Sequence, residues 1–246
     1  MNDSLFLIGQ LIILLLVFGL LRSLQFGLRH AFYQLSLKGQ QIRFILAGIF
    51  FWLAIISCLA YLGFFQDFSS WPPRVIFVLA PPILLSIGLL FSPSFRLLLR
   101  TIPPSWLVHI QAFRIVMELF LWMGYKAGYV PPQMTFEWLN FDIIVGLTAP
   151  LAGFVFFGQR RFRKPEAILW NVFGILLLLN ILILAILSTP SPWRVFLNDP
   201  ANTFVATFPF ILIPGFIVPF AFSMHLFSLY QVFSSKRDKI QFRLRR

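Results

Sequence analysis

The chain has 246 residues, of which 59% are hydrophobic and only 11% are charged, and its mean hydropathy is +0.86. A soluble domain carries about 25% charged residues, so this composition excludes an ordinary soluble domain and favours an integral membrane protein. The single cysteine, Cys58, excludes an intramolecular disulfide and a cysteine-built zinc or iron–sulfur site. The net charge of +12 alone would suit nucleic acid, but the basic residues flank apolar segments, and no nucleic-acid partner is expected.

Apolar stretches long enough to cross a bilayer predict the fold. A helical span needs about 20 mostly apolar residues. We therefore expect an all-α bundle of seven transmembrane helices, a single domain over residues 1–246. The predicted spans are about 4–21, 44–64, 74–92, 107–129, 141–158, 167–188 and 208–233. The first lacks a basic leading region and a small-residue cleavage site before Arg22, so we expect a retained helix and no signal peptide.

The distribution of basic residues predicts the orientation. With seven spans, the basic residues that follow spans one, three, five and seven all fall on one side. They are Arg22, Arg29, Lys38, Arg43, Arg96, Arg100, Arg160, Arg161, Arg163, Lys164, Lys236, Arg237, Lys239, Arg243, Arg245 and Arg246. The positive-inside rule then places the N-terminus outside and the C-terminus in the cytoplasm. A bacterial cytoplasmic membrane is the expected location.

Two basic segments have a simple membrane role. The tail, residues 234–246, is predicted to be cytoplasmic, and residues 22–43 interleave basic and apolar side chains. This interleaving is typical of a helix that lies at the membrane interface. We expect both segments to contact anionic lipid headgroups at the cytoplasmic face of the bilayer.

The most informative residues are Arg114 and Glu118, one helical turn apart in the predicted fourth span. Each ionisable group costs roughly 2.5–3.5 kcal/mol at the centre of a membrane helix on insertion scales. A chain that keeps two of them needs them for assembly or for an activity. Two readings remain open. The residues form a structural clamp by pairing at i, i+4, or they belong to a binding or proton-handling site in a cavity.

Other polar residues lie at depths that match this pair. From about 1.5 Å of rise per residue, Arg114 and His225 have similar depth, and so do Glu118 and Asn180. A binding site of Arg114, Glu118, His225, Gln111 and Asn180 is predicted in the cytoplasmic half, provided that spans four, six and seven are neighbours. In this site Arg114 would hold an anionic group, Glu118 would position Arg114 or exchange a proton, and His225 would titrate.

The predicted seventh span is interrupted by prolines. Pro209, Pro214 and Pro219 recur every five residues, and each removes a backbone hydrogen bond and bends a helix. Such breaks persist in membranes where neighbouring groups satisfy the freed carbonyls. We expect a kinked helix, which suits a gate or a ligand pocket as well as ordinary packing.

A further segment, residues 134–150, lies on the predicted outer side. Glu137 and Asp142 stand near the start of span five, where carboxylates complement the helix dipole. They are weaker candidates for a site at the outer mouth, for a cation or a small amine. Gly146 and Ala149 are small enough to allow close helix packing.

Several chemistries find no support. No HExxH, GxSxG or glycine-rich phosphate loop occurs, and span seven has no lysine for a retinal Schiff base. No metal site and no cofactor is predicted. His109 and His225 differ in depth by roughly 9 Å, which makes a bis-histidine haem strained.

These observations favour a small transporter- or receptor-like membrane protein that binds a small molecule or a proton. The alternative is a non-catalytic subunit or scaffold that binds a protein partner through its basic face. A haem- or metal-dependent membrane enzyme is less favoured.

Overall fold

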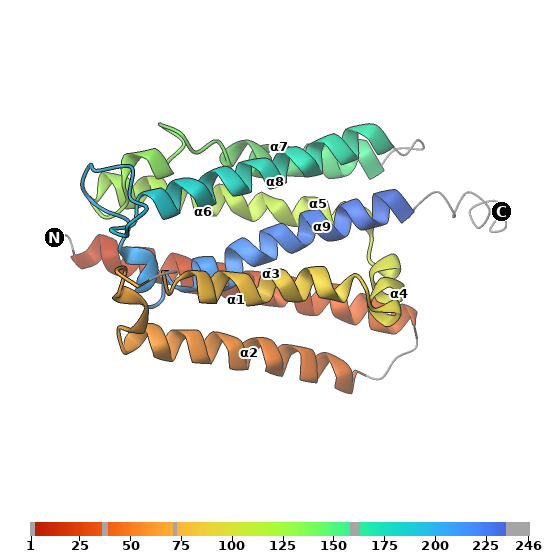
Figure 1. Cartoon of the computed structure of the whole chain (residues 1–246). Helices are drawn as coiled ribbons and strands as arrows, with labels where there is room; N and C mark the ends of the chain where they lie inside the picture. The colour runs from red at the N-terminus through yellow and green to blue at the C-terminus, as the bar shows by residue number, and fades with distance from the viewer. Residues whose placement is uncertain (1–2, 36–38, 71–72, 158–162, 235–246) are drawn as a thin grey trace.

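The structure is a computed structural model that describes residues 3–35, 39–70, 73–157 and 163–234. Every regular element in these ranges is helical, and the long helices run roughly side by side (Figure 1). We call the end that carries residues 62–70, 73–75, 127–142 and 188–212 the loop end. The other end carries the short helix α4 (Pro93–Thr101), and we call it the α4 end. The basic tail predicted at residues 234–246 lies outside the described residues except for Ser234.

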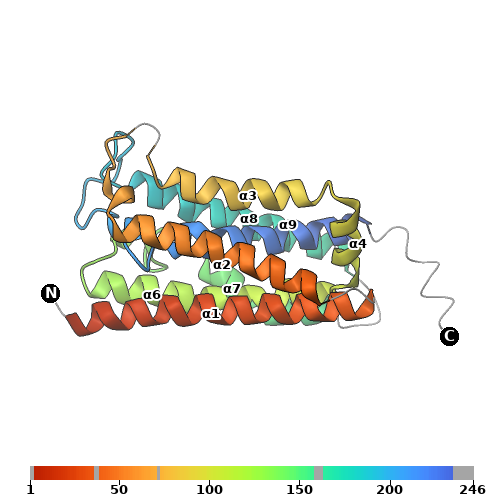
Figure 2. The same cartoon turned by 90° about the horizontal axis from the view of Figure 1, so that it is seen from below.

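Helices α1 (Asp3–Gln34) and α2 (Gln40–Tyr61) form one side of the bundle (Figure 2). The 32 residues of α1 span about 48 Å at 1.5 Å per residue, which exceeds the roughly 30 Å hydrocarbon core. Residues 22–34 continue this helix without a break and α2 begins at Gln40, whereas the sequence suggested an interfacial helix over residues 22–43. The run stays helical because no proline interrupts it and its apolar residues Leu24, Leu28 and Phe32 pack against other helices.

Helix α3 (Ile76–Leu89) is followed by α4 (Pro93–Thr101), and the two axes differ by 87°. The turn has a local cause: the Ser92 side chain accepts a hydrogen bond from the Phe95 amide, and Pro93 occupies the first turn of α4. The arginines Arg96 and Arg100 lie on α4, while Leu98 and Leu99 are buried. This short helix lies across the α4 end (Figure 1).

The fourth predicted span is a continuous run of α5 (Pro104–His109), η2 (Ile110–Ala112) and α6 (Phe113–Lys126). It is followed by η3 (Pro132–Met134), by α7 (Ile143–Phe157) and by α8 (Lys164–Leu187). Two other short elements, η1 (Phe64–Gln66) and η4 (Phe204–Ala206), lie at the loop end.

The last span begins with a π-helical turn, η5 (Ile213–Ile217), which continues into α9 (Val218–Ser234). Pro219 has no N–H group, so the Gly215 carbonyl loses its usual i+4 donor. The indole Nε1 of Trp52 on α2 donates to this carbonyl at 2.9 Å. The predicted irregular helix is therefore present, and a neighbouring helix satisfies a freed carbonyl.

Helix α9 lies in the middle of the bundle in both views (Figures 1 and 2). In its span 67% of the residues are buried, against 22% in that of α1. It packs against α8, α3 and α5. The polar contacts include a buried serine pair, in which the hydroxyls of Ser86 on α3 and Ser223 on α9 lie 2.6 Å apart.

The predicted all-helical architecture with apolar spans is confirmed, but the number of spans is not. Among the described residues, five helices are long and apolar enough to cross a membrane, and the number is six if the bent α3–α4 pair is counted as one span. The predicted span 141–158 corresponds to α7, which has only 15 residues.

Candidate functional site

Close packing between α6 and α7 brings the charged residues together. A Cβ atom at Gly146 would lie 2.8 Å from the backbone nitrogen of Ile115, so only glycine permits this approach. Ala149, one turn further along α7, is fully buried. This contact places Asp142, at the start of α7, beside Arg114 on α6.

Arg114 forms an ion pair with Asp142. Its Nη1 lies 3.0 Å from Asp142 Oδ1, and the two side chains are 2% and 6% exposed. Nη1 also donates to the Gly174 carbonyl of α8 at 3.4 Å. Among the described residues, no ion pair within 4.0 Å joins Arg114 to Glu118. The i, i+4 pairing considered for the clamp is therefore replaced by a contact between helices.

Glu118 is held by the segment that precedes α7. The Asn140 Nδ2 donates to Glu118 Oε2 at 2.7 Å and to the Met134 carbonyl at 3.0 Å. The Asn140 Oδ1 accepts from the Asp142 amide at 3.1 Å. One buried asparagine thus fixes Glu118 and the backbone of Asp142 in the same small region.

Arg114 keeps unused hydrogen-bond donors. Its Nε and Nη2 are buried and have no hydrogen-bond partner in the described part of the chain. A buried donor without an acceptor costs about 1–3 kcal/mol, and more when the group is charged. These two nitrogens therefore need a hydrogen-bond acceptor, such as a water or a bound molecule.

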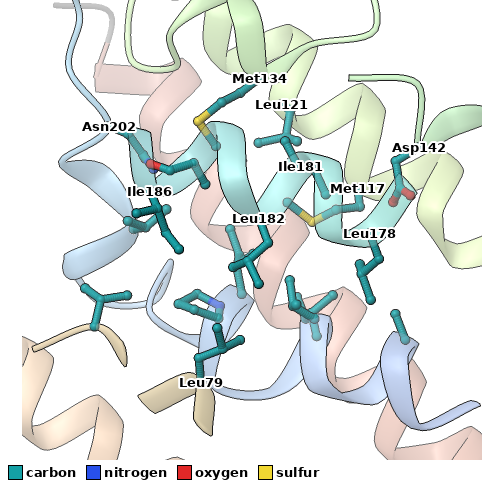
Figure 3. Close-up of a pocket in the computed structure, with 18 of the residues that line it drawn as sticks. Leu79, Met117, Leu121, Met134, Asp142, Leu178, Ile181, Leu182, Ile186 and Asn202 are labelled. Carbon is teal, nitrogen blue, oxygen red and sulfur yellow. The ribbon is translucent and has the colours of Figure 1, made fainter. Parts of the chain in front are cut away.

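A cavity of about 100 Å³ is lined in part by Arg114, and Figure 3 shows other residues of its wall. Arg114, Glu118 and Asp142 line one region of it, and Thr189 and Asn202 line another. Most of the remaining wall is apolar. It comes from α3, α6, α8, η5 and the loops, and includes Leu79, Met117, Leu121, Leu182, Ile186 and Ile217. A volume of roughly 10–15 Å³ of this kind holds one water molecule, so the space admits several waters or part of a ligand.

The cavity has a closed base and a more open flank. Leu121 on α6 and Ile217 on η5 are almost fully buried. At the flank between α3 and α8, Leu79, Leu182 and Ile186 are only half-buried. The loop end is closed by residues that are less than a tenth exposed, including Phe68, Asn202 and Phe204. The cavity therefore reaches the surface between α3 and α8.

His225 and Gln111 are both fully buried, and neither lines the cavity. His225 Nδ1 lies 3.0 Å from Asn171 Oδ1, and the Asn171 amide donates to Ser228 at 3.0 Å. Gln111 Nε2 donates to the Ala221 carbonyl at 3.0 Å. Gly174 lies between Arg114 and His225: Arg114 donates to its carbonyl, while a Cβ atom there would meet the His225 ring.

Asn180 and Glu137 also lie apart from the cavity. Asn180 is half-buried and donates to the Leu139 carbonyl at 2.8 Å. Glu137 accepts from Lys126 at 2.8 Å and from Trp122 at 2.7 Å at the exposed rim. Of the predicted site residues, the cavity thus brings together Arg114, Glu118 and Asp142. Asp142, expected with Glu137 at the outer mouth, is instead the buried partner of Arg114.

Sequence patterns missed two features of this site. The first is Asn140, which connects Glu118 to Asp142 and which stood within the segment already noted for its carboxylates. The second is the apolar wall, because its residues are indistinguishable in sequence from those that face lipid. No cluster of three His, Cys, Asp or Glu residues suited to a metal ion occurs in the described ranges.

Glu137 gives a prediction for the rim. Hydrogen bonds from Lys126 and then from Trp122 hold the pKa of Glu137 below its ordinary value. A lowered pKa stabilises the folded state above the unfolded-state pKa of about 4.3, and this contribution is lost as the pH falls. We expect Glu137→Gln to lower the unfolding temperature slightly at pH 7, and the difference from the wild type to disappear towards pH 3.

The control for this measurement is Asp199→Asn, since Asp199 is 92% exposed and lies 3.6 Å from Arg194. It should change the unfolding temperature less than Glu137→Gln does at pH 7. A difference for Glu137→Gln that persists at pH 3 would contradict the ionic origin of the effect.

Comparison with known proteins places the site within a family. No curated protein and no solved structure matches the chain. A family model described as a domain of unknown function, DUF8737, matches residues 72–233. The match begins just before α3 and ends in the last turn of α9, so it contains all the residues that line the cavity except Phe68. The chain therefore belongs to the DUF8737 family.

Proposed function

We propose that this chain is a membrane-embedded binding protein of the transporter or receptor type, and that its ligand occupies the cavity beside Arg114. The observation that best supports the proposal is the buried environment of Arg114. It is 1% exposed, yet two of its nitrogens have no partner in the described residues and it lines an otherwise mostly apolar cavity. Intramembrane ionisable groups of this kind usually face a functional cavity.

A purely structural clamp accounts for less of the geometry. A buried ion pair is weak evidence for stability, because the desolvation of two charges offsets their attraction. A clamp also needs no cavity, and it gains nothing from leaving Nε and Nη2 without acceptors. The cavity next to a charged group with spare donors favours a binding site.

We infer that seven segments cross the membrane. The α3–α4 pair would count as one crossing, and the short α7 as another. The first turn of α1 and the last turn of α9 lie at opposite ends of the bundle, which supports an odd number of crossings (Figure 1).

Charge pairing supports an orientation with the loop end outside and the α4 end in the cytoplasm. At the loop end, Arg74 pairs with Asp67 at 2.6 Å, Lys126 with Glu137 at 2.8 Å and Arg194 with Asp199 at 3.6 Å. Arg96 and Arg100, at the α4 end, have no acidic partner within 4.0 Å in the described residues. An excess of unpaired basic residues is typical of the cytoplasmic side. In this orientation the cavity opens in the outer half, whereas the sequence predicted a site in the cytoplasmic half.

The test is to fill the cavity by a substitution and to measure whether a bound small molecule is lost. Ala185 on α8 lines the cavity and is half-buried. We expect Ala185→Phe to occupy the space, so that a small molecule that co-purifies with the wild type is depleted at least tenfold. Mass spectrometry of extracts from the purified full-length chain measures this depletion.

Leu176→Phe is the matched control, because Leu176 lies on the same helix and is 57% exposed to the surroundings. Its extract should equal that of the wild type, and all three proteins should elute as one species with the same helical content. Identical extracts from all three would overturn the proposal. A membrane protein that co-purifies equally with all three would favour the scaffold alternative.

A further inference from the structure

The distribution of polar and apolar residues on the cavity wall indicates which class of ligand fits the cavity. Arg114, Glu118 and Asp142 supply the polar region on the α6 and α7 side. Leu79 and Leu182 supply apolar surface on α3 and α8. A ligand that covers both regions needs a polar head and an apolar tail, which is the construction of an amphiphile. Ligand pockets commonly combine apolar walls with a few polar groups that fix orientation.

The charges of the polar region restrict the head group. Arg114 contributes one positive charge and Asp142 one negative charge, and Glu118 contributes one negative charge or none. With the Arg114–Asp142 ion pair formed, the sum is therefore minus one or zero. An anionic head group would add an uncompensated charge to an apolar cavity, which is costly. The structure thus disfavours the anionic ligand that the sequence suggested for Arg114.

The unused hydrogen-bonding groups restrict the head group further. Arg114 Nε and Nη2 are donors that need acceptors, and Asp142 Oδ1 has an ion-pair contact but no hydrogen bond in the described chain. A cationic ammonium group would leave the two arginine donors unpaired, because it accepts no hydrogen bond. A hydroxyl group accepts and donates, so it satisfies both partners without adding charge.

The open flank indicates how such a molecule enters. Leu79, Leu182 and Ile186 are half-buried at the surface between α3 and α8, and Phe68, Asn202 and Phe204 close the loop end. The flank of a membrane bundle faces lipid, so a tail dissolved in the bilayer reaches the cavity without crossing water. Figure 3 shows the side chains of Leu79 and Leu182 in the space between α3 and α8.

We propose that the cavity beside Arg114 binds an uncharged, hydroxyl-bearing single-chain amphiphile that enters from the bilayer between α3 and α8. Its hydroxyl head group would accept from Arg114 and donate to a carboxylate, and its chain would lie along Leu182. This inference rests on the proposed function and adds the chemical class of its ligand.

The experiment uses the single cysteine. In a Cys58→Ser chain, Leu179→Cys places a polarity-sensitive fluorophore beside the flank, because Leu179 is 42% exposed and lies one turn from Leu182 on α8. The full-length protein is titrated in detergent. We expect 1-monotetradecanoylglycerol to change the emission saturably. Tetradecanoate and tetradecyltrimethylammonium should need at least tenfold higher concentrations, and glycerol alone and tetradecane should be weaker than the monoacylglycerol.

Two controls separate binding from partition into detergent. The label at Leu169→Cys, on α8 at a position 71% exposed, should give no saturable change with any compound. Arg114→Gln should remove the preference for the monoacylglycerol over tetradecane, and Ala185→Phe should abolish the response while leaving the polar residues intact.

Each outcome has a distinct meaning. If the charged amphiphiles bind as tightly as the monoacylglycerol, the uncharged head group is wrong and the binding function stands. If no compound gives a saturable response at Leu179→Cys, the inference falls. The proposed function is also overturned if, in addition, Ala185→Phe depletes no co-purified molecule. If Ala185→Phe does deplete one, the proposed function stands.

Discussion

Asp142→Ala is expected to destabilise the protein by about 3–5 kcal/mol, the usual cost of leaving one member of a buried ion pair without its partner. Arg114 would keep its charge at 1% exposure with only the Gly174 carbonyl as acceptor in the described residues. Unfolding in denaturant, with the protein in a defined detergent, measures the loss. Unchanged stability would show that the ion pair contributes nothing to the fold.

The double variant Arg114→Met, Asp142→Ala separates structure from function. Replacing both charges by apolar groups is often neutral or stabilising, so we expect most of the lost stability to return. Ligand binding should not return, because the donors Nε and Nη2 are gone. A double variant that folds and still retains a co-purified molecule would refute the role of Arg114 in binding.

Gly174→Ala is the second substitution with a large expected effect. An added Cβ atom would lie 2.3 Å from His225 Cε1 and 2.4 Å from Nε2, which is too close for atoms that are not bonded. The ring cannot move freely, since it is fully buried and contacts Asn171 at 3.0 Å. Overpacking of this kind costs about 1–3 kcal/mol, measurable as a lower unfolding temperature.

Two further variants test the cause of that effect. His225→Ala should relieve the clash, so the combination with Gly174→Ala should be less destabilised than the sum of the two single changes. Gly48→Ala on α2 is the matched control, because nothing lies within 4 Å of the added Cβ. If the destabilisation of the double variant equals the sum of the two single changes, the clash with the His225 ring is not the cause of the effect.

The helices follow from local sequence more fully than the site does. Runs of apolar residues locate the helical segments, and Pro214 and Pro219 mark the irregular start of the last span. The length of α1 depends on tertiary contacts, and the right-angle turn into α4 depends on a local cap at Ser92. A hydropathy pattern carries neither kind of information.

In the site, too, some residues can be predicted from the sequence and others depend on tertiary contacts. Arg114 and Glu118 attract attention in sequence because each is costly in an apolar run. Their partners come from α7 and the segment before it, and that contact depends on how closely Gly146 lets the helices approach. Depth along a helix is readable from the sequence, but the rotation of the helix is not. Asn180 has the depth of Glu118 and yet contacts Leu139 instead.

The short length of α3 has a consequence for the surrounding lipid. Its 14 residues rise only about 21 Å, while a hydrocarbon layer is about 30 Å thick. A bilayer adapts to such hydrophobic mismatch by thinning locally. Because Leu79 on α3 forms one edge of the cavity, the interface with water would dip toward the cavity mouth. A hydroxyl head group would then descend a shorter distance through hydrocarbon to reach Arg114.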